Sequence, residues 1–183
     1  MAAKGRVLVV EDSFLMRRII TDIIDGDPEL EVVGKAKDGD EALEKAASLK
    51  PDVITLDINL PVKDGIEVLQ ELVEKQPTRV IMLSAYTRAG ATATMRALEL
   101  GAVDFIAKPA GEISLGLDKL RSEIVSKIKL AAKIDFDKYL SSFQAPPAPV
   151  IEEIKPAGIR KLVIIGASTG GPKAVLDIMK DIP

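Results

Sequence analysis

Five side chains able to take part in phosphoryl chemistry each follow a short apolar run: Glu11, Asp12, Asp57, Ser84 and Lys108. If the fold brings the three carboxylates within a few ångströms of one another, they cannot all stay ionised without a cation among them. Because the chain contains no Cys and no His, only hard oxygen ligands are available to a metal ion. Such ligands indicate Mg²⁺. Beside such an ion, Asp57 could attack phosphorus as a nucleophile, while Lys108 and Ser84 bind the equatorial oxygens.

The apolar runs that end at these residues are predicted to be strands of one parallel sheet. They occupy residues 6–10, 30–36, 53–57, 79–83 and 103–106, and segments with helical spacing follow each of them, the last at 113–133. Five strands alternating with five helices predict an α/β fold, a doubly wound parallel sheet with helices on both faces. In the flavodoxin-like strand order 2-1-3-4-5, the first and third strands are neighbours, which would bring Glu11, Asp12 and Asp57 to one crevice.

Each of the five residues also has a simpler explanation. Asp57 could cap the following turn or helix, the acidic pair could be turn residues, and the Ser and Lys could be an ordinary strand end and a surface charge. For Asp57 taken alone, the two explanations have equal weight. The arrival of all five at the carboxyl ends of strands favours a site.

Composition argues against several other classes of function. The 183 residues carry a net charge of −3 and no Lys/Arg-rich block, which argues against a nucleic-acid partner. The absence of cysteine excludes disulfides, thiolate catalysis and Cys-ligated metal. No run approaches the roughly 18 apolar residues of a membrane span, and the N-terminus lacks the apolar segment of a signal peptide. We therefore expect a cytoplasmic protein without membrane insertion.

The alternation of strands and helices stops after residue 133. Residues 134–159 contain the Pro-rich stretches 145–149 and 155–158, which cannot continue a helix, so this range is predicted to be a partly extended linker. Another apolar run at 161–165 leads into Gly-Ala-Ser-Thr-Gly-Gly-Pro at 166–172. The chain is thus expected to divide into a domain at 5–133, a linker at 134–159 and the first part of a second α/β domain at 160–183.

The Gly-rich turn at 166–170 fits the nucleophile-elbow pattern G-x-S-x-G, with Ser168 between a strand and a helix. A phosphate-binding P-loop does not fit, because Lys173 is displaced by one position and no Ser or Thr follows it. In isolation, a Gly-rich strand-to-helix turn that binds nothing explains this segment equally well.

Residues 5–130 resemble the receiver domain of two-component response regulators. The matching motifs, in order and spacing, are Val-Val-Glu-Asp-Ser at 9–13, Asp57 with Pro61 and Asp64-Gly65, Ser84-Ala85, and Asp-Phe-Ile-Ala-Lys-Pro at 104–109. The resemblance implies that Asp57 accepts a phosphoryl group from a histidine kinase. It also implies that Glu11, Asp12 and Asp57 bind Mg²⁺, together with the backbone carbonyl of Asn59.

The same resemblance implies three further roles. Ser84 and Lys108 would bind the phosphoryl group, and Phe105 would be the aromatic whose rotamer reports activation. The bond between Lys108 and Pro109 would be a cis peptide. Ser84 and Phe105 stand where many receivers have Thr and Tyr, and both are common variants in that family.

The run Ile-Ile-Gly-Ala-Ser-Thr-Gly-Gly-Pro at 164–172 resembles the start of the catalytic domain of chemotaxis protein-glutamate methylesterases. Residues 88–94 and 109–117 also resemble the receivers of that family. The resemblance implies a Ser-His-Asp esterase, with Ser168 as nucleophile, that demethylates glutamates and deamidates glutamines on methyl-accepting chemoreceptors under control of a chemotaxis histidine kinase. Because the sequence has no His, and the family's catalytic Asp is expected beyond Pro183, the chain as given is expected to be inactive as an esterase.

Three other interpretations are possible. The chain could be a stand-alone phosphorylatable receiver that acts as a signalling module through partner contacts. A haloacid-dehalogenase-like phosphatase also forms an aspartyl phosphate, but its motif has a second Asp two residues after the nucleophile, where this sequence has Asn59. A DNA-binding regulator would carry a basic helix-turn-helix after the linker, and none is present.

Overall fold

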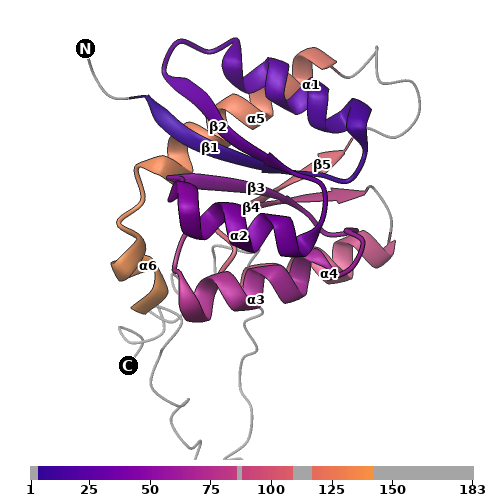
Figure 1. Cartoon of the computed structure of the whole chain (residues 1–183), viewed down its shortest axis with the longest axis vertical. Helices are drawn as coiled ribbons and strands as arrows, with labels where there is room; N and C mark the ends of the chain where they lie inside the picture. The colour runs from indigo at the N-terminus through magenta and orange to yellow at the C-terminus, as the bar shows by residue number, and fades with distance from the viewer. Residues whose placement is uncertain (1–3, 86–87, 109–116, 142–183) are drawn as a thin grey trace, which may run out of the picture. The chain divides into compact units, whose positions relative to one another are not determined.

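The structure, a computed structural model, describes residues 4–85, 88–108 and 117–141. Strands and helices alternate along the chain (Figure 1). The strands are β1 (Gly5–Val10), β2 (Leu30–Ala36), β3 (Val53–Asp57), β4 (Arg79–Ala85) and β5 (Asp104–Lys108). The helices are α1 (Phe14–Asp25), α2 (Gly39–Leu49), α3 (Gly65–Lys75), α4 (Arg88–Glu99), α5 (Leu117–Ala132) and α6 (Phe136–Ser141).

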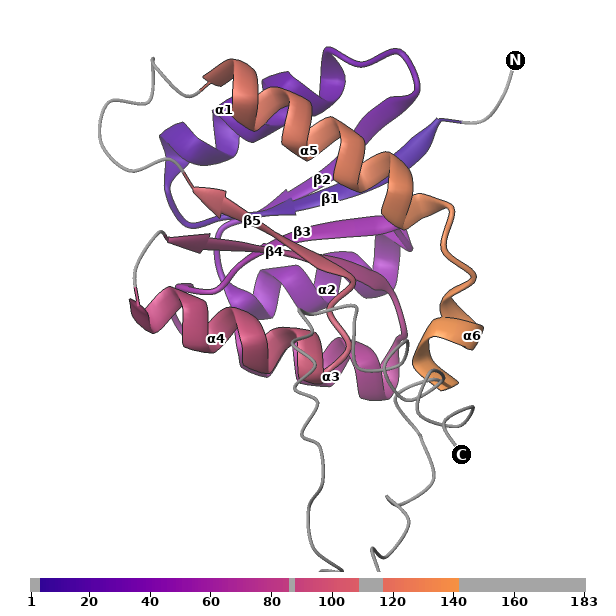
Figure 2. The same ribbon diagram turned by 180° about the vertical axis from the view of Figure 1, so that it is seen from behind.

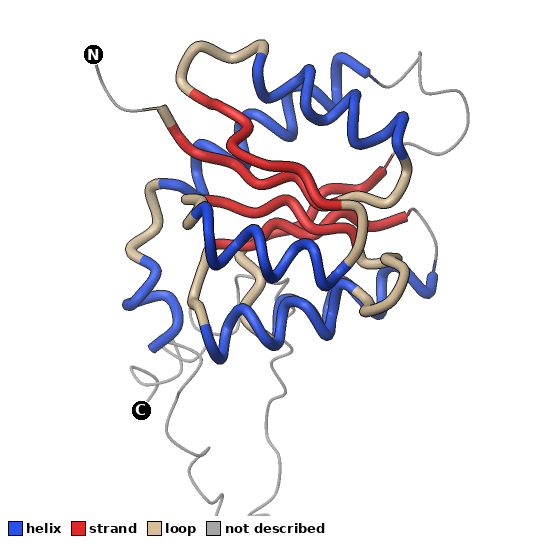
Figure 3. Tube along the Cα trace, in the orientation of Figure 1, coloured by secondary structure: helices blue, strands red, loops and turns tan. Residues whose placement is uncertain are grey.

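The five strands form one parallel sheet in the order β2-β1-β3-β4-β5. Helices α1 and α5 cover one face, and α2, α3 and α4 cover the other (Figures 1 and 2). The tube view shows the sheet as the middle of three layers (Figure 3). The predicted doubly wound α/β fold with strand order 2-1-3-4-5 is therefore confirmed.

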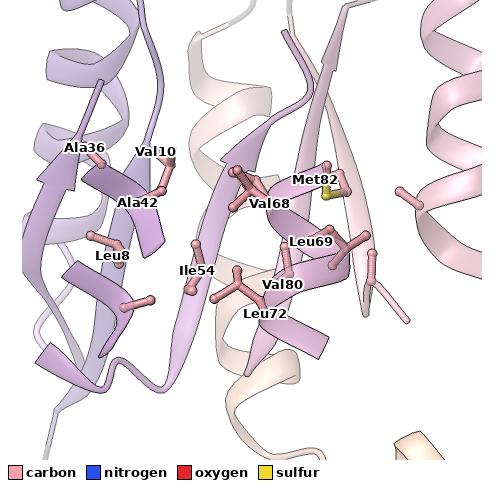
Figure 4. Packing of buried hydrophobic residues seen from close by; sticks show 14 of the residues in the cluster. Leu8, Val10, Ala36, Ala42, Ile54, Val68, Leu69, Leu72, Val80 and Met82 are labelled. Atoms are coloured by element: carbon pink, nitrogen blue, oxygen red, sulfur yellow. The ribbon is translucent and has the colours of Figure 1, made fainter. Parts of the chain in front are cut away.

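Each face of the sheet carries its own hydrophobic core, because successive strand residues point to opposite faces. On the α2, α3 and α4 side, Leu8, Ile54 and Met82 pack against Val68 and Leu72 (Figure 4). The core on the other side is formed by α1, α5, the strands β1, β3, β4 and β5, and the first residue of β2. Its buried residues are Val7, Val9, Ile20, Ile23, Ile24, Leu30, Val53, Ile81, Leu83, Ile106, Leu120, Ile124, Ile128 and Ala131. The central strand β3 is buried along its whole length, as its apolar run predicted.

A short helix that the sequence analysis did not predict, α6, lies in the range assigned to the linker. It is held against the amino ends of β4 and β5: the Arg79 side chain donates to the Ile134 carbonyl, and the Tyr139 hydroxyl donates to the Ala102 carbonyl at 2.7 Å. Six residues are too few to form a stable helix alone, so these tertiary contacts explain why local sequence signals did not reveal it.

The remaining parts of the predicted domain division, the linker beyond residue 141 and the α/β segment at 160–183, lie outside the described residues. All described residues belong to the first of two compact units, Met1–Ala145. Within the described ranges, no helix has the length and apolar character needed to cross a bilayer.

Candidate functional site

The sheet topology brings the predicted acidic residues together. β1 and β3 are direct neighbours, and Val10 is level with Leu56, so Glu11, just after β1, and Asp57, the last residue of β3, come at the same end of the sheet. Asp12 comes next along the chain, before α1 begins. A carboxylate oxygen from each of Glu11, Asp12 and Asp57 lies within 4.8 Å of the others.

The three carboxylates differ in their access to solvent. Glu11 and Asp57 are each only 1% exposed, whereas Asp12 is exposed. Two of the acids are thus buried, and Asp12 alone of the three is open to solvent. Because every donor is a hard carboxylate oxygen, this set fits Mg²⁺.

Lys108, the last residue of β5, joins the two buried acids. Its Nζ lies 2.7 Å from Asp57 Oδ2 and 3.0 Å from Glu11 Oε2, and the side chain is itself largely buried. The other Asp57 oxygen, Oδ1, accepts the backbone N–H of Asn59 at 3.3 Å. Lys108 therefore compensates part of the negative charge and fixes the orientation of the Asp57 carboxylate.

Burial governs the ionisation of this cluster. It raises the pKa of Glu11 to about 7, with the charge of Asp57 acting in the same direction and Lys108 opposing it. Burial also raises the pKa of Asp57 above its ordinary value, although the hydrogen bond and charge of Lys108 lower it. For Lys108, burial lowers the pKa, but pairing with Asp57 and Glu11 outweighs burial and the net shift is upward. The pairing thus favours the charged form of Lys108, whereas burial favours the protonated form of Glu11.

The loop after Asp57 is set by the Asp64-Gly65 pair. A Cβ atom on Gly65 would lie 2.0 Å from the Asp57 carbonyl oxygen, so only glycine lets α3 begin this close to the end of β3. The Gly65 N–H donates to the Ile58 carbonyl, and Asp64 caps α3 in a capping box with Glu67. These two residues position the loop that carries Asn59, an exposed residue beside the site.

Two predicted residues do not contact the acidic cluster. The Ser84 hydroxyl, on β4, donates to the Gly90 carbonyl of α4 at 3.2 Å rather than to a carboxylate. Phe105, on β5, is half-buried against the core of the α2, α3 and α4 side, and Lys127 of α5 lies 4.9 Å from its ring centroid. Their assigned roles stay predictions.

Other predictions fall outside the described residues. Ser168 and its Gly-rich turn lie there, and so does Pro109, with the predicted cis bond to Lys108. One residue near the site was missed in the sequence: Arg17 of α1, whose side chain donates to the Glu11 and Asp12 carbonyls. The only sequence feature that could have pointed to Arg17 is a basic residue near the start of α1, close to the acidic pair. Arg18 shares that feature, so the sequence does not distinguish the two.

The family model described as the response regulator receiver domain matches residues 7–117. The chain belongs to the response regulator receiver family. The match runs from within β1 to the first residue of α5 and includes the acidic cluster and Lys108.

Curated relatives of this receiver are named protein-glutamate methylesterase/protein-glutamine glutaminase. The relative from Thermotoga maritima is 49% identical over 178 residues, covering 97% of this chain and 51% of the relative. The relative from Pyrococcus abyssi is 45% identical over 184 residues, covering 98% of this chain and 50% of the relative. The chain thus spans about half the length of the curated relatives it matches.

Solved structures give the same picture for the receiver. The response regulator domain of Thermotoga maritima CheB aligns with a TM-score of 0.67 and 54% identity, covering 72% of this chain and 98% of that domain. The receiver domain of the putative regulator NarL from Mycobacterium tuberculosis aligns with a TM-score of 0.63 and 32% identity, covering 72% of this chain and 98% of that chain. Both solved structures are receiver domains, in agreement with the family match.

Proposed function

We propose that Asp57 is phosphorylated by a histidine kinase and that this modification regulates a protein-glutamate methylesterase. The observation that carries the first part is the convergence of three carboxylates and Lys108 at one edge of the sheet. Asp57 lies at the centre of this arrangement, since it is next to both acids and paired with the lysine.

The phosphoryl transfer would use the groups already present. A carboxylate oxygen of Asp57 forms a bond to phosphorus, the bond from phosphorus to the imidazole nitrogen of the donor breaks, and that nitrogen takes up a proton. Lys108 neutralises charge on the transferred phosphoryl oxygens, and Ser84 would have to turn its hydroxyl away from the Gly90 carbonyl to reach them. Glu11, Asp12, Asp57 and the Asn59 carbonyl would hold Mg²⁺, which supplies further charge neutralisation when bound.

The test is labelling with acetyl phosphate, a small donor that replaces the kinase. With Mg²⁺, intact-mass spectrometry should show one added phosphoryl group on the wild-type chain and none on Asp57→Asn. Asp118→Asn, which changes an exposed aspartate of α5, is the matched control and should label normally. Removing divalent ions with EDTA should abolish labelling. Full labelling of Asp57→Asn would exclude Asp57 as the acceptor.

The second part of the proposal concerns the downstream activity. The names of the relatives, and the G-x-S-x-G turn at Ser168, support a catalytic domain that hydrolyses glutamate methyl esters and deamidates glutamines on chemoreceptors. The proposal includes a chemotaxis histidine kinase as the phosphoryl donor and the cytoplasm as the compartment of the receiver. We expect phosphorylation at Asp57 to raise turnover by the catalytic domain.

The experiment for this part measures methanol release from methylated receptor. The 183-residue chain has no histidine to activate Ser168, so it should release methanol only at the background rate. A longer form that supplies His and Asp partners should be active and should respond to acetyl phosphate. Release by the short chain that disappears in Ser168→Ala would contradict the requirement for a histidine. An active longer form that ignores acetyl phosphate would contradict control by the receiver.

A further inference from the structure

The side chain of Arg17, near the start of α1, extends back to the acidic loop, the residues Glu11 and Asp12 between β1 and α1. Its Nη1 donates to the Glu11 carbonyl at 2.5 Å and to the Asp12 carbonyl at 3.0 Å. The side chain is half-buried, whereas that of the next residue, Arg18, is exposed and pairs with Asp22 one turn along the helix. The two arginines are neighbours in sequence, but only the first contacts the loop that carries the acids.

The contacts of Arg17 are to backbone and not to carboxylates. Within the described residues, Arg17 forms no ion pair with an Asp or Glu side chain. A guanidinium bound to the Glu11 or Asp12 carboxylate would compete with a cation for the same oxygens. By binding the two carbonyls instead, it fixes the turn and leaves the carboxylate oxygens available.

Fixing this turn matters because the acids repel one another. Three carboxylate oxygens lie within 4.8 Å, and Asp12 is exposed, with no hydrogen bond or ion pair to its carboxylate among the described residues. A free turn would relax by moving Asp12 outward, away from Asp57. A charge-assisted hydrogen bond to each carbonyl opposes that movement.

The aromatic ring of Phe14 packs against the Arg17 guanidinium. Phe14 is 74% exposed, an unusual position for a large apolar residue, and the Arg17 Cζ lies 5.9 Å from its ring centroid. A cation–π contact of this kind reduces the access of water to the guanidinium and restrains its position. The exposed aromatic and the half-buried arginine thus form one unit over the β1–α1 loop.

We propose that Arg17 is a positioning residue for the cation at the phosphorylation site: through the Glu11 and Asp12 carbonyls it holds both carboxylates toward Asp57. The inference rests on the proposed function, because it assumes that this cluster binds Mg²⁺. Supporting groups of this kind typically change metal affinity by about 10- to 100-fold when they are removed.

The sign of the effect separates positioning from simple electrostatics. Removal of a positive charge near a cation site should strengthen cation binding if charge alone acts. If positioning dominates, Arg17→Gln should weaken Mg²⁺ binding in spite of the lost positive charge. We expect the dissociation constant for Mg²⁺ to rise by about tenfold or more.

The experiment is calorimetric titration of the chain with Mg²⁺ in the absence of any phosphoryl donor, with Arg18→Gln as the matched control. Arg18→Gln should bind within about twofold of wild type, since its partner Asp22 is remote from the cluster. Urea unfolding in EDTA reports whether each variant is folded. Arg17→Lys, which keeps the charge and one donor nitrogen, should bind Mg²⁺ with an affinity between those of wild type and Arg17→Gln.

Acetyl phosphate labelling supplies a second readout. For Arg17→Gln the Mg²⁺ concentration for half-maximal labelling should rise in parallel with the dissociation constant, and saturating Mg²⁺ should restore most of the rate. Unchanged or tighter Mg²⁺ binding by folded Arg17→Gln and Arg17→Lys would overturn the proposal. A wild-type chain that neither binds Mg²⁺ nor labels would instead refute the proposed function, and this inference with it.

Discussion

Glu11 is a buried carboxyl whose ionisation is opposed by its surroundings. It is 1% exposed, and burial together with the charge of Asp57 raises its pKa from 4.5 to about 7. In the unfolded chain the same carboxyl ionises near its ordinary value. Between these two values the folded state therefore holds a proton that the unfolded state has released.

The metal-free protein should accordingly lose stability as pH rises between about 4.5 and 7. The contribution of Glu11 is fully present below the lower value and is lost above the upper one, and its size is about 3 kcal/mol. Urea unfolding in EDTA from pH 5 to 8 should show a steeper decline for wild type than for Glu11→Gln. Equal slopes in the two proteins would mean that Glu11 is ionised throughout that range.

Thr55 has a buried hydroxyl without a hydrogen-bond partner, the one such side-chain atom among the described residues. It lies on β3, fully buried, two residues before Asp57. An unsatisfied buried hydroxyl costs about 1–3 kcal/mol, so Thr55→Val should raise the free energy of unfolding by about 1 kcal/mol. Thr21→Val is the control, because that buried hydroxyl donates to the Arg17 carbonyl, and it should be neutral or destabilising. A loss of stability in Thr55→Val would imply that the hydroxyl has a partner.

At the scale of elements, the β3–α3 loop contains a strained turn. Val62 has a φ of 70° and is 81% exposed, and the Lys63 N–H donates to the Pro61 carbonyl at 2.9 Å, which closes a γ-turn centred on Val62. The γ-turn with positive φ is rare, and a β-branched residue is poorly suited to it. The loop is held on its far side by Lys63, which pairs with Glu71 and Asp40. The strain is thus imposed by the flanking contacts.

Val62→Gly should stabilise the protein by about 1 kcal/mol. Relief of roughly 1–3 kcal/mol of backbone strain outweighs the 0.5–1 kcal/mol that glycine loses in conformational entropy. Val62→Ile keeps the branched Cβ and should leave stability within about 0.5 kcal/mol. Chemical denaturation of wild type, Val62→Gly and Val62→Ile measures these differences in the free energy of unfolding. A destabilised glycine variant would show that the turn is not strained.

At the scale of the whole molecule, α6 extends the folded receiver beyond α5. Arg79 donates to the Ile134 carbonyl through two nitrogens at 2.7 and 3.0 Å, and its guanidinium lies 5.7 Å from the Phe136 ring centroid. Phe136 is 7% exposed and stacks on Tyr139 at 5.8 Å. These contacts are made at the amino ends of β4 and β5, the edge of the sheet opposite to Asp57. Helix α6 is therefore docked at the end of the sheet opposite to the acidic cluster.

Arg79→Met should release α6 without affecting phosphorylation. Loss of the charge-assisted hydrogen bonds to Ile134 weakens docking by about 1.5 kcal/mol, which should speed amide hydrogen exchange at 134–141 roughly tenfold. Labelling of Asp57 by acetyl phosphate should be unchanged. Arg18→Met, which alters an exposed arginine with a helical partner, should change neither measurement. Unaltered protection of α6 in Arg79→Met would show that aromatic packing alone holds this helix.

The order of the five strands and of helices α1 to α5, and the residues at the carboxyl ends of the strands, were determined by the sequence alone. Hydrophobic periodicity is a local property, and a parallel sheet places all strand ends of one kind at one edge. Glu11, Asp12, Asp57 and Lys108 could therefore be grouped before their distances were known. The same reasoning placed Ser84 at this edge of the sheet, but it could not predict the direction in which the Ser84 hydroxyl points.

Tertiary structure alone decided which side chains contact the acidic loop and which segments outside the predicted elements are ordered by distant contacts. Arg17 and Arg18 have the same chemistry, and the phase of α1 against β1 selects the one that binds the acidic loop. The six residues of α6 become helical because Arg79 and Ala102, distant in sequence, satisfy Ile134 and Tyr139. The positive φ of Val62 likewise follows from contacts on both sides of its turn, against the preference of valine itself. In each case the deciding energy comes from partners that are distant in sequence, so a local pattern cannot carry it.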